Sequence, residues 1–394
     1  MQDLPRGFDL AAAQAGFKYK GRPDLALIFS RAPARAAGVF TTNAFQAAPV
    51  QVARENLTGS DLVRAVLVNA GQANACTGEE GLADCRRTLD MLAGLLDISP
   101  GQVLPASTGV IGVRMPMHIW EKSLPGLVEG LGKCSGDQAA MAIMTTDTFP
   151  KTASREIELE RGRVSFWGMT KGAGMICPDM ATMLAFVLTD MQVDGPEWQE
   201  MLAVAMEKSF NAITVDGDTS TNDCVLALAN GESGVSCKSR EDRDKTAKAL
   251  EDVCRDLAYQ IVKDAEGGTK VMHIRVTGAA DSRDARKAAR AVGNSSLVKT
   301  AMFGRDPNWG RIVAALGRSG AGFDPGKVRL SLAGLEIFSG GRPVDMDIDE
   351  VFAPLLAYRD IRVDIDLGSG EAEYFLLASD LTDEYIRINS DYRS

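Results

Sequence analysis

The chain has 394 residues, of which 45% are hydrophobic and 24% are charged. This composition can bury an ordinary core, and the length predicts two or three domains, or one large domain followed by a smaller one. The formal net charge of −10, with no run of Lys or Arg, argues against a protein that binds nucleic acid. No window approaches 18 consecutive apolar residues and the first residues lack a signal-peptide pattern, so we expect neither a membrane span nor export.

Cysteine and histidine usage narrows the chemistry further. The seven cysteines form no Cys-x-x-Cys pair, which argues against a zinc ribbon or a redox dithiol. Their odd number predicts reduced thiols in the cytoplasm. The only two histidines, His118 and His273, make a Ser-His-Asp triad an unfavoured alternative. His273 lies in the alternating segment KVMHIRV and His118 beside Trp120, so we interpret both as structural.

In chain order, the first elements are a strand, a helix and a hairpin. Residues 64–70 (RAVLVNA) have the apolar run of a short buried strand, and a polar loop follows them. Segment 154–170 predicts a hairpin that turns at Arg161–Gly162. Between this strand and the hairpin, an amphipathic helix is predicted. Its apolar residues recur at spacings of three and four, and they are Leu82, Cys85, Leu89, Leu92 and Leu96.

The second half begins with a strand and two helices. Met183–Leu188 is continuously apolar after the turn at Pro178–Asp179, which is typical of a strand buried on both faces. One helix is predicted to begin at Gly195–Pro196, and the longest runs from about Arg240 to Ala265 before Gly267–Gly268. Further strands are predicted at 327–338, 361–368, 371–380 and 384–389.

This order of elements predicts an α/β chain with helices covering sheets. Segment 276–290 (VTGAADSRDARKAAR) is the best candidate for a domain boundary. We therefore expect a large domain over residues 1–285, which contains the start of the buried strand, and a smaller α/β domain over residues 286–394.

The stretch CPDMATMLAF (177–186) delivers the Thr182 hydroxyl to the start of that buried strand. A threonine hydroxyl is a poor nucleophile without a nearby base, but a free α-amino group on the same residue can serve as that base. Its reference pKa of about 7.7–8.0 leaves much of it neutral near working pH. Thr182 can use this chemistry only after the Ala181–Thr182 bond has broken. The alternative is that Thr182 merely opens the strand.

The segment KGAGMICPDMATMLAFVLTD resembles the self-cleaving segment of the ornithine acetyltransferase family, also called bifunctional glutamate N-acetyltransferase. The resemblance covers nearly the whole chain. It rests on further blocks in family order, which are NAGQANACTG (69–78), ASTGVIG (106–112), TTDTFPK (145–151), SFNAITVDGDTSTND (209–223), GRDPNWGRI (304–312) and RINSDYRS (387–394).

The resemblance implies a fold, a maturation and an activity. The fold is a four-layer αββα sandwich followed by the smaller C-terminal α/β domain. The precursor is expected to cut itself between Ala181 and Thr182 into chains 1–181 and 182–394, which stay associated as a heterotetramer of two chain pairs. N2-acetylornithine then acetylates the threonine, and the acetyl group passes to glutamate in arginine biosynthesis. Whether acetyl-CoA also serves as a donor stays open.

The resemblance also assigns the site residues. Thr182 is the nucleophile, and Thr108 and Gly109 form the oxyanion hole. A hydroxyl and an unhindered backbone N–H suit that role, because such donors are worth roughly 3 kcal/mol each at a tetrahedral oxyanion. Of the substrate contacts, Lys171 suits a carboxylate and Glu266 an ammonium. The full set of substrate contacts is Thr148, Lys171, Thr182, Glu266, Asn389 and Ser394.

Several residues depart from the family pattern, and rival functions remain. Asp179 is the departure closest to the nucleophile, and the others are Gln72, Ala173, Cys177, Ala212 and Ser394. The acidic segment 216–223 lacks the spacing of an EF-hand, so we assign no metal and no resident cofactor. One rival is an aminopeptidase or amidase of the same superfamily, in which water takes the acyl group. The other is an uncleaved, inactive relative that binds amino acids.

Overall fold

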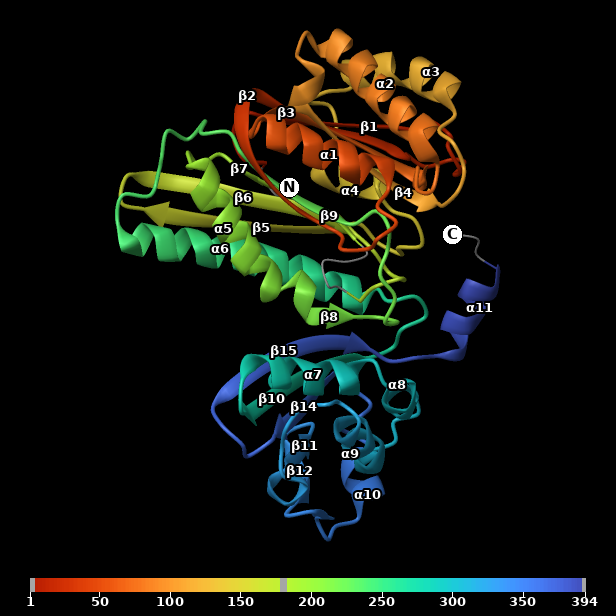
Figure 1. Cartoon of the computed structure of the whole chain (residues 1–394), viewed down its shortest axis with the longest axis vertical. Coiled ribbons are helices and arrows are strands. Elements are labelled where there is room, and N and C mark those ends of the chain that lie inside the picture. The colour runs from red at the N-terminus through yellow and green to blue at the C-terminus, as the bar shows by residue number, and fades with distance from the viewer. Residues whose placement is uncertain (1–3, 178–182, 392–394) are drawn as a thin grey trace.

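The computed structural model describes residues 4–177 and 183–391, which form two units (Figure 1). We call them the sandwich unit, which holds the described residues up to 268, and the C-terminal unit, which follows it. The sandwich strands are β1 (Phe8–Ala13), β2 (Leu25–Phe40), β3 (Leu62–Gln72), β4 (Val103–Val110), β5 (Lys151–Leu159), β6 (Gly162–Lys171), β7 (Leu184–Thr189) and β9 (Cys224–Ala229). Its helices are α1 (Ala48–Gly59), α2 (Gly78–Leu96), α3 (Met117–Glu129), α4 (Gly136–Ala142), α5 (Gly195–Glu207) and α6 (Arg240–Lys263).

The long strand β2 joins two layers of sheet. Its first half, from Leu25 to Phe29, pairs antiparallel with β3, and its last residues, from Arg35 to Phe40, pair antiparallel with β9. The register breaks between Phe29 and Ala34, where Pro33 supplies no backbone N–H. Beyond this break Ala34 and Arg35 still pair with β3, and the strand then passes to the second layer through its pairing with β9. β1, β3 and β4 continue the first layer, and β9, β7, β6 and β5 the second.

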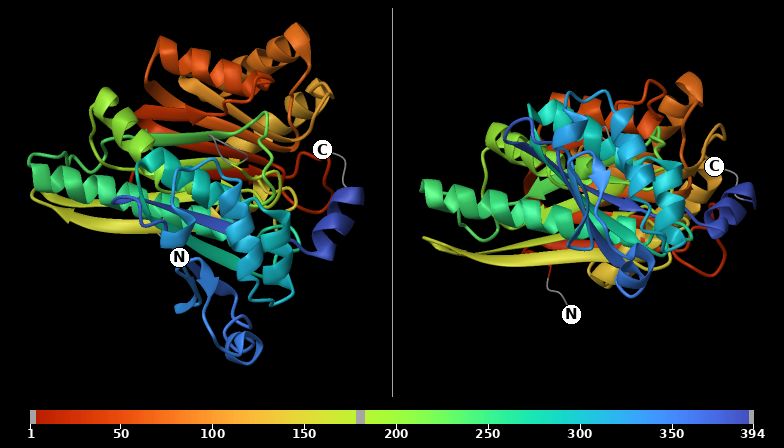
Figure 2. Two further views of the ribbon diagram at one scale, coloured as in Figure 1. Left: turned by 60° about the horizontal axis from the view of Figure 1, so that its bottom comes forward. Right: turned by 90° about the horizontal axis from the view of Figure 1, so that it is seen from below.

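Side chains alternate between three cores, which shows that the two layers lie face to face. Ile28 of β2, Phe186 of β7 and Leu226 of β9 share one core between the sheets. Their neighbours Leu27 and Val187 point the opposite way. α1, α2 and α3 cover the outer face of the first layer, and α5 and α6 that of the second, as Figures 1 and 2 show. The arrangement is the αββα sandwich expected from the sequence.

The C-terminal unit is built on a second sheet in the order β13-β12-β11-β14-β10-β15-β8. Its strands are β8 (Ile213–Thr214), β10 (Val271–Ala279), β11 (Arg329–Leu332), β12 (Leu335–Ser339), β13 (Arg342–Pro343), β14 (Asp360–Asp366) and β15 (Ala372–Ser379). Its helices are α7 (Ser282–Gly293), α8 (Ser296–Phe303), α9 (Trp309–Gly317) and α10 (Ile348–Phe352), and α11 (Asp383–Asp391) ends the described chain. Short 3-10 turns at 100–102, 210–212 and 325–327 complete the structure. β8 comes from the sandwich part of the chain, so the second sheet is shared.

Most predicted elements are confirmed, including the hairpin of β5 and β6 and the helices α2, α5 and α6. The strand predicted at 384–389 is wrong, because these residues lie in helix α11. Thr382 accepts a hydrogen bond from the Tyr385 N–H at 3.2 Å, and Asp383 and Glu384 occupy the first turn. A threonine cap followed by acidic residues starts a helix and outweighs the alternating pattern.

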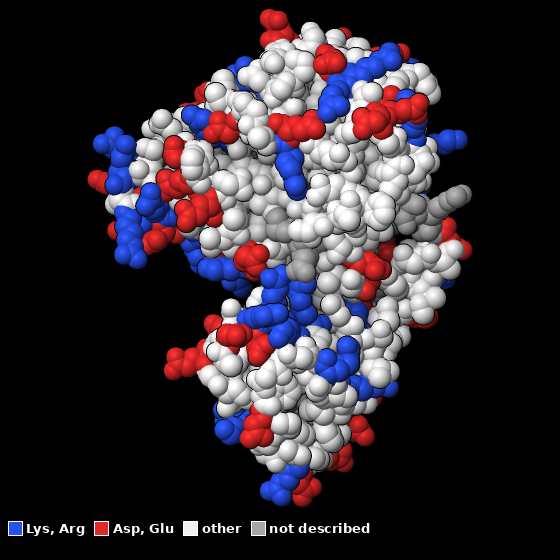
Figure 3. Space-filling view, in the orientation of Figure 1, with Lys and Arg blue, Asp and Glu red and all other residues white. Residues whose placement is uncertain are grey.

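The division of the chain into cores differs from the boundary drawn in the sequence at residue 285. β10 lies before that boundary, yet Met272, Ile274 and Val276 belong to the C-terminal core. The two units are separated by a notch on the face shown in Figure 3, where acidic and basic side chains are intermixed. In the described part of the chain, no helix is long and apolar enough to cross a membrane.

Phe186 tests the core between the two sheets. Its side chain is fully buried, so Phe186→Ala should lower the free energy of unfolding by about 3–5 kcal/mol. Phe45→Ala removes a ring that is 70% exposed and should change it by less than about 0.5 kcal/mol. Urea unfolding followed by tryptophan fluorescence measures both. Equal losses in the two variants would contradict the assignment of Phe186 to the inter-sheet core.

Candidate active site

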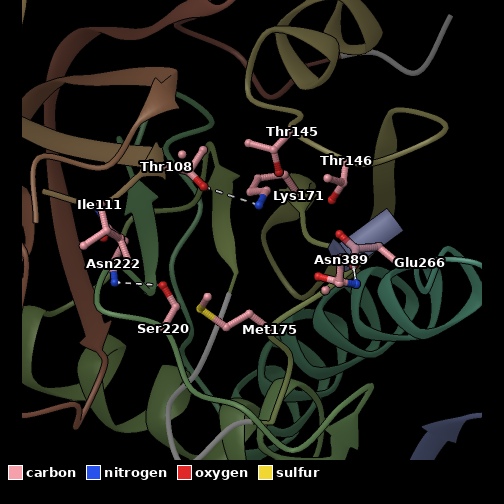
Figure 4. A pocket seen from close by; sticks show the side chains of 12 residues that line it. Thr108, Ile111, Thr145, Thr146, Lys171, Met175, Ser220, Asn222, Glu266 and Asn389 are labelled. Carbon is pink, nitrogen blue, oxygen red and sulfur yellow. Dashed lines mark hydrogen bonds between the residues drawn. The ribbon is translucent and has the colours of Figure 1, made fainter. Parts of the chain in front are cut away.

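One pocket gathers five of the residues assigned from the sequence (Figure 4). It lies where the ends of β4 and β6 meet the loops around residues 145, 174 and 220, the end of α6 and helix α11. The predicted residues that line it are Thr108, Gly109, Lys171, Glu266 and Asn389. The lining residues not singled out in the sequence are Ile111, Thr145, Thr146, Gly174, Met175, Ser220 and Asn222.

Thr108 and Gly109 occupy an irregular end of β4. The parallel pairing of β3 with β4 shifts register at Gly71–Gln72, opposite these two residues. Gly109 has φ +132°, and a Cβ there would lie 2.2 Å from the carbonyl carbon of Gly71. Only glycine fits such a close approach of two backbones at positive φ. The distortion brings the Thr108 hydroxyl and the Gly109 backbone to the wall of the pocket, an arrangement compatible with the predicted oxyanion role.

Lys171 approaches that hydroxyl from the neighbouring strand. Its Nζ lies 3.4 Å from Thr108 Oγ1, and the lysine is buried at the end of β6. Because the ammonium donates to Oγ1, the hydroxyl hydrogen of Thr108 is directed elsewhere and can serve an oxyanion. Burial lowers the pKa of Lys171, while the nearby Asp147 carboxylate acts in the opposite direction.

A buried ion cluster supports the pocket from behind. The Lys151 ammonium contacts the carboxylates of Asp147 at 2.6 Å and Asp264 at 2.5 Å, and all three side chains are almost fully buried. Asp147 also accepts the N–H of Gly172 at 2.7 Å. Burial would raise the pKa of Asp147, but the cations of Lys151 and Lys171 and the Gly172 N–H lower it to about 2. The cluster therefore fixes the strand end that bears Lys171.

The acidic side of the pocket is formed by Glu266 and Asn389. Asn389 Nδ2 donates to Glu266 Oε2 at 2.7 Å, which links α11 to the end of α6. The Glu266 N–H donates to the carbonyl of Ala173 at 2.9 Å. A Cβ at Gly174 would lie 2.4 Å from Glu266 Oε2, so a side chain at this position would displace the carboxylate from where it lies. The pocket thus has a buried cation and a carboxylate on separate walls.

The remaining predicted residues are placed differently. Thr148 donates its N–H at 3.0 Å, and also its hydroxyl, to Asp264, and it is not among the described lining residues. Thr182, its neighbour Ala181, the departure Asp179 and the terminal Ser394 lie outside the described residues.

The sequence analysis missed the charged partners of this site. Asp147 and Lys151 stand in the block TTDTFPK, of which only Thr148 was singled out. Their spacing of four residues was a signal that the two could pair, but their burial beside Asp264 was not visible. Asn222 also lies in a quoted block, and its side-chain amide donates to the carbonyls of Ala73 and Ser107 at 2.7 and 2.9 Å.

Residues 9–394 match the model of the ArgJ family. The chain belongs to the ArgJ family. A relative from Nitratidesulfovibrio vulgaris, named arginine biosynthesis bifunctional protein ArgJ, is 54% identical over 100% of both chains. A protein of the same name from Syntrophotalea carbinolica is 48% identical over 98% of this chain and 99% of its own.

A solved structure agrees with the family assignment. The structure of arginine biosynthesis bifunctional protein ArgJ from Bacillus halodurans is 38% identical, with a TM-score of 0.52. The match covers 54% of this ArgJ-family chain and 100% of the Bacillus halodurans chain.

The Asp147 carboxylate gives the ArgJ-family site a pH-dependent stability. Because its pKa is about 2 in the folded chain and about 3.9 in the unfolded chain, it stabilises the fold fully above about pH 4. That contribution is lost as the pH falls from about 4 to 2. Asp147→Asn should therefore be less stable by about 3 kcal/mol at pH 7, and the difference should shrink over that range.

Thermal unfolding at a series of pH values measures this difference. Asp244→Asn is the control, because the Asp244 side chain is 75% exposed. It should match the unsubstituted protein throughout. A gap between Asp147→Asn and the unsubstituted protein that stays constant down to pH 2 would contradict the assignment.

Proposed function

We propose that this chain is a self-cleaving acyltransferase that moves the acetyl group of N2-acetylornithine to glutamate through an acetyl-Thr182 ester. The observation that supports this most directly is the pocket that brings Thr108, Gly109, Lys171 and Glu266 together. Both substrates are amino acids, so a site for them needs a cation for a carboxylate and a carboxylate for an ammonium. The names of the ArgJ relatives support the same pathway.

The described residues that follow Thr182 in the chain support its assignment as the nucleophile. Leu184, the first residue of β7, is the antiparallel partner of the pocket residue Lys171. The Met183 carbonyl accepts the Cys224 N–H at 3.2 Å, which anchors the entry to the strand. Thr182 directly precedes Met183 in the chain. It is therefore only two residues from Leu184, the strand partner of the pocket residue Lys171.

In the proposed cycle, the Thr182 hydroxyl attacks the acetyl carbonyl of acetylornithine while its α-amine takes the hydroxyl proton. Thr108 and the Gly109 N–H donate to the oxyanion. Collapse of the intermediate breaks the amide bond, and the leaving ornithine amine takes the proton from the Thr182 ammonium. Glutamate then attacks the ester through its own amine and leaves as N-acetylglutamate, which returns the hydroxyl. We propose acetyl-CoA as a second donor to the same threonine, in keeping with the word bifunctional in the relatives' names.

One comparison supports cleavage between Ala181 and Thr182, and the strand pairing is compatible with it. The solved ArgJ chain from Bacillus halodurans matches about half of this chain over its whole length, whereas the relative from Nitratidesulfovibrio vulgaris matches all of it. A half-length chain is what a cut near residue 181 would give. The strand ladders also explain how both products stay together, because β6 pairs with β7 and β2 with β9 across the predicted cut.

Assembly and compartment are proposed on the same basis. We propose a heterotetramer of two chains 1–181 and two chains 182–394. We place the enzyme in the cytoplasm, since the described cysteines are all free, and Cys85, Cys177, Cys224 and Cys254 are buried.

Maturation gives the first test. The purified protein should show two fragments in place of the 42.1-kDa chain, with Thr182 as the new N-terminus, and Thr182→Ala should remain whole and inactive. Intact mass and N-terminal sequencing measure this. Thr58→Ala removes an exposed threonine and should be cut normally. A single uncut chain in the unsubstituted protein would favour the inactive, amino-acid-binding relative.

Kinetics give the second test. Acetylornithine and glutamate should give parallel double-reciprocal plots, and acetylornithine or acetyl-CoA alone should leave an acetyl group on Thr182. Thr108→Ala should lower kcat by about 10²-fold or more, because it removes an oxyanion donor. Glu266→Gln should instead raise the KM for acetylornithine, because the charge is lost in the ground state and the transition state alike. An acetyl group that passes to water as fast as to glutamate would favour the amidase.

A further inference from the structure

One carboxylate holds the loop that precedes the predicted cleavage site. Asp216 accepts the N–H of Met175 at 2.6 Å on Oδ2 and the N–H of Ile176 at 2.9 Å on Oδ1. Met175 has φ +56°, a conformation that a residue with a side chain seldom adopts without support. The Val215 N–H also donates to the Ile176 carbonyl at 2.6 Å. The backbone six and seven residues before Thr182 is therefore set by Asp216 and its neighbour Val215.

Helix α11, which lies far from Asp216 in the sequence, contacts the same carboxylate. The Tyr385 hydroxyl donates to Asp216 Oδ2 at 3.1 Å, so both carboxylate oxygens are engaged. Burial raises the pKa of Tyr385, and Asp216 raises it further, which keeps the hydroxyl a proton donor. Figures 1 and 2 show that α11 lies apart from the rest of the C-terminal unit, at the edge of the molecule.

The start of α11 is anchored against the end of α6. The Thr382 hydroxyl donates to the Gly267 carbonyl at 3.0 Å. Gly267 has φ +66°, and a Cβ there would lie 2.7 Å from the Tyr385 nitrogen. Docking of the helix therefore depends on a glycine at this position, and correct docking places the Tyr385 hydroxyl on Asp216.

We propose that Asp216 is a positioning residue for self-cleavage and that the Tyr385 hydroxyl completes its arrangement, so that the precursor is cut efficiently only after α11 has docked. This inference rests on the proposed cleavage between Ala181 and Thr182. Attack on a peptide carbonyl requires a closely defined backbone geometry, and small displacements from it slow such reactions. A loop held by a residue whose last partner lies near the C-terminus reaches that geometry only when the whole chain has folded.

The first experiment removes the hydroxyl from the full-length chain. Precursor made by cell-free translation is sampled over time, and the loss of the uncut band gives the cleavage rate. Tyr385→Phe should slow cleavage about two- to tenfold, the effect of one lost hydrogen bond. Tyr358→Phe is the matched control, because Tyr358 is 70% exposed, and it should cleave at the unsubstituted rate. Equal rates for the two variants would overturn the proposal.

A second pair of variants tests the docking of α11 without substituting Asp216 or Tyr385. Gly267→Ala introduces the clash with the Tyr385 nitrogen and should slow cleavage at least as much as Tyr385→Phe. Gly234→Ala has the same backbone strain, at φ +70°, but nothing lies within 4 Å of its new Cβ. It should therefore leave the rate unchanged. Equal slowing by both would assign the effect to backbone strain and overturn the role of docking.

A double-substitution cycle separates positioning from general stability. Asp216→Asn should slow cleavage by about tenfold or more, and adding Tyr385→Phe should slow it little further, because the hydroxyl acts through the carboxylate. In the uncut Thr182→Ala background, Tyr385→Phe should leave the melting temperature nearly unchanged. Additive slowing, or slowing that follows the melting temperature, would overturn the proposal. If the unsubstituted precursor is never cut, the proposed function itself fails. If the precursor is cut but Tyr385→Phe does not slow the cut, only the role of Tyr385 fails, so the two failures can be told apart.

Discussion

The buried ammonium of Lys151 lies between the carboxylates of Asp147 and Asp264, and the geometry of the site depends on this cluster. Asp147 fixes the start of the glycine-rich loop through Gly172, and Asp264 fixes Thr148 and the end of α6. Segments more than one hundred residues apart in sequence are joined by these three side chains. Desolvating such charges costs several kcal/mol per ion, which the cluster offsets only when every partner is in place. The cluster therefore favours one arrangement of the surrounding backbone.

Around this cluster, the pocket separates charge in a way that suits a zwitterionic substrate. Lys171 lies on the inner wall beside Thr108, while Glu266 is held by Asn389 where α6 meets α11. A substrate with a carboxylate and an ammonium can bind to both walls at once, and Thr108, one of the two proposed oxyanion donors, lies beside the Lys171 wall. The glycines at 109 and 174 permit this arrangement, because a side chain at either position would meet backbone or carboxylate atoms.

The sandwich also holds together the two chains that the proposed cleavage would produce. The predicted cleavage site separates β6 from β7, yet these strands are hydrogen-bonded along their whole shared length. The core between the sheets draws Trp167 from one product and Phe186 from the other. The C-terminal unit is joined to the sandwich by β8, whose two residues pair with β15. In a chain cut as proposed, backbone ladders and shared cores would link the two products in place of the peptide bond.

The sequence by itself determined the elements whose signals are local. The apolar run after Met183, the hairpin turning at Arg161–Gly162 and the spacing of leucines in α2 each depend on neighbouring residues, and each is confirmed. Resemblance to a family named five residues that the structure brings into one pocket; four of them lie in the blocks that carry the resemblance, and Glu266 lies outside those blocks. The strand predicted at 384–389 was wrong because side-chain alternation is weaker than a capped, acidic helix start.

Tertiary structure alone decided the contacts between distant segments. The Lys151 cluster joins residues 147 and 264, and Asp216 joins the loop at 175 to Tyr385. No spacing in the sequence predicts either of these long-range contacts. The change of layer within β2 was equally invisible, because each half pairs with strands that come later in the chain. Burial gives these groups their partners and their strength, and burial is a property of the folded chain as a whole.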